Sequence, residues 1–162
     1  FLYFYMNKEY ITAALYKWIE SFLEKPNSLL DNWSPCPYAR KARLDKKIYI
    51  DFEVPNIYKI VSLLDTYDVL VICYDHTKIT SSQFNSYAKN LNTELIPKNY
   101  VVLEDHPDAV EIINGVTMNF GECALLLIQK RDALKIASDK LKSKGYYKLW
   151  SPEDLNEVVN WR

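Results

Sequence analysis

Hydrophobic and polar positions along this chain follow two spacings, one typical of helices and one typical of strands. Over residues 7–25 apolar residues recur every three or four positions, which predicts an N-terminal helix that starts with Asn7 as its cap and stops at Pro26. The same spacing, bounded by capping and turn residues, predicts further helices over residues 37–45, 56–66, 81–91, 132–144 and 151–162.

Four other segments have the pattern of strands. Residues 48–54 alternate between apolar and polar side chains, which is typical of a strand with one exposed face. Residues 69–74 and 123–128 are continuous apolar runs, which are typical of strands buried on both faces. A fourth, shorter strand is expected over residues 100–103.

The order of these elements predicts an α/β fold. We expect one domain over residues 1–162, with an N-terminal helix (7–25), a βαβαββα core (36–145) and a C-terminal helix (151–162). Helices between successive strands favour parallel crossovers, so the sheet of about four strands should be mixed and mostly parallel, with helices on both faces. A thioredoxin-like arrangement is compatible with this order.

Composition narrows the class of protein. A net charge of −1 gives no reason to expect a nucleic acid or an anionic membrane as partner. Three cysteines without a CxxC spacing argue against a disulfide framework and for a reducing cytoplasm. The apolar residues 1–5 are too few to span a bilayer and lack the pattern of a signal peptide. We therefore expect a soluble, cytoplasmic protein; its oligomeric state stays open.

One cysteine stands where a helix N-terminus would stabilise a thiolate. Cys36 lies between two prolines at the start of the predicted helix 37–45, and Arg40 adds positive charge nearby. Cys36 is therefore a candidate reactive or metal-binding thiol, and Arg40 a candidate catalytic or substrate contact. The alternative is that Cys36 is a small buried residue in a proline-rich turn. Cys73 and Cys123 lie in apolar strands and are expected in the core.

The only two histidines follow aspartates at the ends of two predicted strands, as Asp75-His76 and Asp105-His106. Ligands of open α/β sheets bind beyond the carboxyl ends of the strands, so both pairs should lie at one functional edge. With Cys36, the two imidazoles would suit iron, zinc or copper, and Asp75 and Asp105 could ligate or orient them. The alternative is two ordinary polar turns.

Asn119, ahead of the last predicted strand, could join the same edge and contact a substrate or cofactor. Most such residues are simply solvated, so this assignment depends on where that strand lies in the sheet.

The segment Cys36-Pro-Tyr-Ala resembles the glutaredoxin motif, in which Cys-Pro-Tyr-Cys opens a helix. Ala39 stands in place of the second cysteine. The resemblance therefore implies a monothiol mechanism and excludes a dithiol one.

A longer resemblance is to the bacterial domain of unknown function family 1415. The corresponding motifs run in the same order here, as Trp18, Cys36-Pro-Tyr-Ala-Arg40, Asp75-His76, His106-Pro-Asp108 and Asn119. Thr77 departs from the family pattern, which tends to have proline there. The family has no assigned reaction, so the resemblance implies only that Cys36, His76 and His106 belong to one site.

These observations favour a small metal-dependent enzyme, with redox chemistry ahead of hydrolysis, whose metal ligands are Cys36, His76 and His106. One alternative is a thioredoxin- or glutaredoxin-like monothiol protein that uses Cys36 alone. Another is a non-catalytic interaction module, which a virus could encode, that binds a partner through exposed aromatic side chains. The substrate stays open under each hypothesis.

Overall fold

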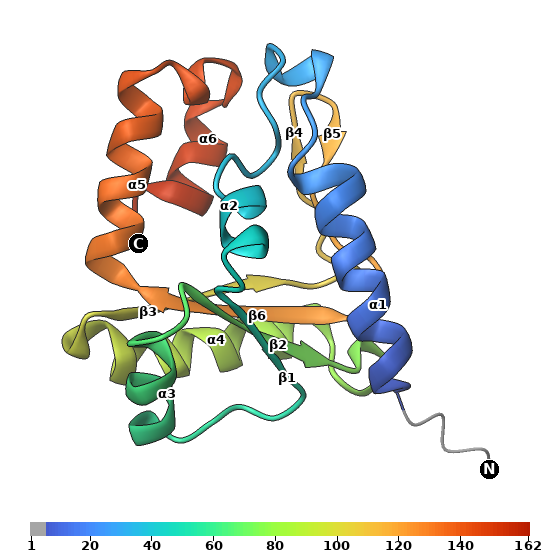
Figure 1. The fold of residues 1–162 in the computed structure, drawn as a ribbon, viewed down its shortest axis with the longest axis vertical. Helices are drawn as coiled ribbons and strands as arrows, with labels where there is room; N and C mark the ends of the chain where they lie inside the picture. The colour runs from blue at the N-terminus through green and yellow to red at the C-terminus, as the bar shows by residue number, and fades with distance from the viewer. Residues whose placement is uncertain (1–5) are drawn as a thin grey trace.

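A four-stranded mixed sheet forms the centre of the structure, a computed structural model that describes residues 6–162 (Figure 1). The strands, in their order across the sheet, are β1 (Ile48–Asp51), β2 (Val69–Tyr74), β6 (Ala124–Lys130) and β3 (Tyr100–Asp105). β1 is parallel to β2, whereas β6 lies between β2 and β3 and is antiparallel to both. β1, β2 and β3 therefore run in the same direction, and their carboxyl ends meet at one edge.

The predicted helices are present with shifted ends. Their bounds are α1 (Lys8–Trp18), α2 (Ala39–Leu44), α3 (Ile57–Leu64), α4 (Ser81–Leu95), α5 (Arg131–Ser143) and α6 (Pro152–Asp154). Single π-helical turns, Ile19–Leu23 and Leu155–Val159, extend α1 and α6. The connection after β3 contains a hairpin of β4 (Ile112–Ile113) and β5 (Val116–Thr117), which the sequence pattern did not predict.

Local capping explains where several helices begin. Asn7 Oδ1 accepts a hydrogen bond from the Tyr10 amide at 3.0 Å and starts α1. Thr80 and Gln83 form a reciprocal capping box at the start of α4, with N···O distances of 3.0 and 3.2 Å. The spacing that predicted these helices therefore agrees with the hydrogen bonds that start them.

Alternating side chains of the strands fill two cores. Leu70 and Ile72 of β2 pack against α3 and α4 on one face of the sheet. Val71 and Cys73 pack against α1 and α2 on the other face, and α5 lies on this side too (Figure 1). The predicted α/β fold, a single domain with a mixed sheet and a leading helix, is confirmed.

Among residues 6–162, no helix is both long enough and apolar enough to cross a membrane. The expectation about the apolar residues 1–5 lies outside the described residues.

Candidate functional site

The two histidines meet at the carboxyl edge of the sheet. His76 follows β2, His106 follows β3, and their ring centroids are 6.1 Å apart with the rings nearly perpendicular at 88°. β2 and β3 are not neighbours, yet they run in the same direction because β6 is antiparallel to each. The expectation that both histidines share one edge is therefore met.

His106 is engaged at both ring nitrogens. Its Nε2 lies 2.9 Å from the Ile79 carbonyl oxygen, and the Asp108 amide donates to its Nδ1 at 3.1 Å. A carbonyl can only accept and an amide can only donate, so the ring is neutral with its proton on Nε2. His106 is 2% exposed and packs against Phe84 of α4. It fastens the turns after β2 and β3 to each other.

His76 is half-buried and opens onto a pocket of about 440 Å³. We call this the histidine pocket; its lining residues are His76, Thr77, Lys78, Ile79, Thr80, Gln83 and Asp108. Thr80 and Gln83 belong to the capping box, so the N-terminus of α4 opens into the pocket. The sequence pattern indicated neither Thr80 nor Gln83 as a cap or as a pocket residue.

Asp75 and Asp105, beside the histidines, hold backbone turns. Asp75 Oδ1 accepts from the amide and the hydroxyl of Thr77 at 3.0 and 2.6 Å. Burial acts to raise the pKa of Asp75, but these bonds and the Lys78 charge outweigh it, so the pKa lies below its usual value. Asp105 is more deeply buried, and burial raises its pKa despite hydrogen bonds from the Phe120 amide and Asn119.

Asn119 belongs to the same hydrogen-bond network as Asp105. Its Nδ2 donates to Asp105 Oδ1 at 2.7 Å, and its Oδ1 accepts from the Glu111 amide at 2.7 Å. Asn119 Nδ2 also donates to the carbonyl oxygens of His106 and Ala109, each at 3.2 Å. From the sequence, Asn119 could join this edge, depending on the position of the last strand; in the structure it lies there and fastens the turn after β3.

Cys36 lies on the opposite face of the sheet from the histidines. It packs with the core around α1, whereas His106 packs on Phe84 in the core around α4. Helix α2 starts only at Ala39 with Tyr38 as its cap, so Cys36 is not at the helix N-terminus itself. Burial raises the pKa of the Cys36 thiol, and this outweighs the amides of Tyr38 and Ala39 and the charge of Arg162. The expected thiolate is therefore not favoured here.

Arg40 is exposed on α2, on the same side of the sheet as Cys36. Its charge contributes to lowering the pKa of Glu24, whose main partner is Arg43. Arg40 is thus separated from the histidine pocket by the sheet.

Within residues 6–162, no group of three or more His, Cys, Asp or Glu side chains is arranged to hold a metal ion. The structure brings His76 and His106 together and leaves Cys36 apart from them, so the three-ligand site expected from the sequence is not assembled in this conformation.

Glu111 is an unusual carboxyl group that no sequence pattern indicated. Burial is the first cause that raises its pKa to about 7, and the carboxylates of Asp105, Asp154 and Glu157 add to the rise, against Arg162. Three of these neighbours, Asp154, Glu157 and Arg162, come from the C-terminal segment, more than forty positions away along the chain. Only folding brings these charges together.

No protein-family model matches the chain, and neither curated proteins nor solved structures include a match to it. The resemblances to the glutaredoxin motif and to family 1415 therefore stay predictions.

Proposed function

We propose that the protein is an enzyme that binds a small polar substrate in the histidine pocket, with His76 as the group that transfers a proton. The observation that carries the proposal is that the only two histidines meet beside a pocket at the carboxyl edge of the sheet. This is the place where open α/β sheets bind ligands. Imidazole is the side chain best suited to proton transfer near neutral pH.

The two histidines have different roles in this proposal. His106 has both nitrogens in hydrogen bonds to the backbone, so it acts as a support rather than as a reactant. Its ring lies against the ring of His76 and restricts the orientation of that ring. A base that is already held in one orientation loses less entropy when the reaction geometry forms.

The charges around the pocket favour a substrate that carries an anionic group. Lys78 lines the pocket, and its Nζ lies 4.0 Å from Asp75 Oδ2. The N-terminus of α4, which is the positive end of the helix dipole, reaches the pocket at Thr80. Asp108 in the lining and Asp75, which is paired with Lys78, are the opposing charges. A small phosphate or carboxylate compound fits this combination better than an apolar one.

A metal-dependent redox enzyme is the second candidate, and the 6.1 Å separation of the two imidazole rings favours it. Because Cys36 packs on the other face of the sheet, Asp108, whose carboxylate is 4.0 Å from His106 Nδ1, would have to move to complete a ligand set with His76 and His106. His106 would have to give up one of its backbone hydrogen bonds to bind a metal. That requirement ranks this candidate below the first.

Nitrogen-15 NMR of the imidazoles tests the proposal, because the chain has only two histidines and His76→Gln assigns their signals. Inorganic phosphate should shift the His76 ring toward its protonated form and perturb the amides of Lys78 and Gln83. Lys78→Met should weaken this response, and the matched control Lys89→Met, on the exposed surface of α4, should not.

Responses scattered over the surface, or unchanged by both Lys78→Met and His76→Gln, would contradict binding in this pocket. One equivalent of Zn²⁺ that shifts both imidazoles, with loss of the effect in His76→Gln, would favour the metal-dependent candidate instead.

A further inference from the structure

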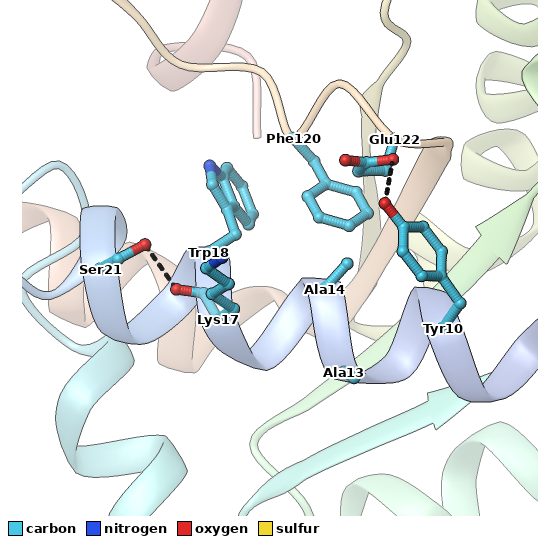
Figure 2. Close-up of a pocket in the computed structure, with 8 residues that line it drawn as sticks. All are labelled: Tyr10, Ala13, Ala14, Lys17, Trp18, Ser21, Phe120 and Glu122. Atoms are coloured by element: carbon cyan, nitrogen blue, oxygen red, sulfur yellow. Dashed lines mark hydrogen bonds between the residues drawn. The ribbon is translucent and has the colours of Figure 1, made fainter.

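A second pocket lies on the outer side of α1, away from the histidine pocket. It has a volume of about 440 Å³, and the small side chains of Ala13 and Ala14 are among the residues that line it. Three aromatic rings line it, those of Tyr10, Trp18 and Phe120 (Figure 2). Two of these rings come from α1 and the third from the segment just before β6, so the pocket exists only in the folded chain.

Contacts with neighbouring groups hold the Trp18 and Phe120 rings in place. The ring centroids of Trp18 and Phe120 are 5.2 Å apart, and the Phe22 ring stacks with that of Trp18 at a centroid distance of 6.1 Å. Phe120 is 7% exposed, and its amide donates to Asp105 Oδ2 at 2.9 Å. The Trp18 and Phe120 rings are therefore held by packing, whereas the exposed Tyr10 ring is held by its hydrogen bond to Glu122.

A carboxylate completes one end of the pocket. Glu122 accepts a hydrogen bond from the Tyr10 hydroxyl at 3.3 Å, and Figure 2 shows this pair at the end of the row of rings. Tyr10 is 56% exposed, so the pair is open to solvent. Lys17 supplies a positive charge on the rim, and the Ser21 hydroxyl is turned away, donating to the Lys17 carbonyl oxygen at 2.6 Å.

We propose that this pocket binds a methylated ammonium group. The faces of aromatic rings carry negative potential and attract organic cations, and quaternary ammonium ligands are recognised by groups of such rings. A carboxylate at the end of the row adds a full negative charge. A methylated cation needs no hydrogen-bond acceptor for each N–H, which suits a pocket whose walls are mostly rings and methyl groups.

The other ligand classes fit this pocket less well. An anion would lie against Glu122 and the π-faces, both of which repel it. A neutral apolar ligand would gain nothing from the carboxylate. The Lys17 side chain lines the pocket and its positive charge repels a cation, so its removal should improve the binding of an external cation. This inference is independent of the proposed reaction, because it uses none of the residues of the histidine pocket.

Titration with choline tests the inference, with 3,3-dimethylbutan-1-ol as the neutral compound of the same shape. Tryptophan fluorescence and amide NMR shifts should report choline binding with a dissociation constant of about 1 mM or tighter. The neutral compound should bind more weakly by a factor of about 5 to 30, which corresponds to the cation–π and carboxylate contributions.

Paired variants identify the groups that bind. Glu122→Gln and Tyr10→Leu should each weaken choline binding, whereas the matched surface variants Glu94→Gln and Tyr16→Leu should leave it unchanged. Lys17→Met should strengthen binding. These positions are exposed, so the variants should fold, and Trp18→Leu serves as a further variant that also removes the fluorescence signal of the pocket.

A methylated ammonium group can come from a free metabolite or from a choline lipid headgroup. Co-sedimentation with phosphatidylcholine vesicles, compared with phosphatidylglycerol vesicles, distinguishes these two sources, and a response to either choline form supports the inference. Equal affinity for choline and its neutral analogue would overturn it. So would choline binding that Glu122→Gln and Tyr10→Leu both leave intact, or an absence of binding at 10-fold the expected dissociation constant, about 10 mM.

Discussion

The roles of the polar side chains at the sheet edge follow from their hydrogen-bond partners. His106, Asp105 and Asn119 each direct their polar atoms at the turns after the strands, and they fasten those turns. His76, half-buried beside them, opens onto the pocket instead. The contacts of the folded chain thus give the two histidines different roles: His106 supports the turns, and His76 is the candidate reactant.

Glu111 carries the clearest pH dependence. Its pKa is raised from the ordinary value of 4.5 to about 7, first by burial. Between these two values the folded state holds a proton that the unfolded state releases, so the stability of the wild type falls as pH rises from about 4.5 to 7. Glu111→Gln removes this loss and should be more stable than the wild type by about 3 kcal/mol at pH 8, relative to the difference at pH 4.

Urea unfolding of both proteins across this pH range measures the effect. The exposed Glu94→Gln variant is the control, and its stability should follow that of the wild type. A constant difference between wild type and Glu111→Gln from pH 4 to pH 8 would show that Glu111 does not titrate in this interval.

At the scale of elements, α4 protects an edge of the sheet. β3 is an edge strand, and the outer amide and carbonyl of Val102 bond to the side chain of Asn92 at 2.8 and 2.9 Å. Asn92 is 8% exposed on α4. Its carboxamide replaces the missing neighbour strand, which satisfies two buried backbone groups and blocks pairing with another chain.

Asn92→Ala should therefore destabilise the protein by about 2–4 kcal/mol, because it leaves two buried backbone groups without partners. Asn90→Ala, on the exposed side of the same helix, gains the same helix propensity and should stay within about 0.5 kcal/mol of the wild type. Chemical denaturation of the two variants measures these effects. If α4 packed on the sheet by apolar contacts alone, both variants would change the free energy of unfolding by similar small amounts.

At the scale of the whole molecule, the sheet separates Cys36 from the histidines. Cys36 belongs to the core on the α1 face, and His106 to the edge of the core on the α4 face. Two groups on opposite faces of a packed sheet cannot share a ligand without rearrangement of the core.

Cys36→Ser should therefore leave the imidazole NMR signals of both histidines unchanged, with and without added Zn²⁺. Phe84→Leu is the positive control, since the Phe84 ring lies 5.7 Å from that of His106 and its loss should move the His106 signals. If Cys36→Ser changed both histidines, or abolished a stoichiometric metal that His76→Gln also abolished, the three-residue site of the sequence hypothesis would regain support.

Much of the fold was predictable, for identifiable reasons. Apolar spacing located α1, α4 and α5, and continuous apolar runs located β2 and β6. The parallel direction of β2 and β3 was enough to place Asp75-His76 and Asp105-His106 at one edge. The hairpin of β4 and β5 was missed because its two-residue strands are too short to show a period.

By itself, therefore, the sequence determined the helices, the four central strands, the two-sided core and the meeting of the two histidines, because periodicity and capping depend on residues near each other in the chain. The insertion of β6 between β2 and β3, the separation of Cys36 from the histidines, the charges around Glu111 and the ring pocket on α1 were decided only by the tertiary structure. Each of these joins residues that are far apart in the chain, and only the packing of the complete core selects such contacts.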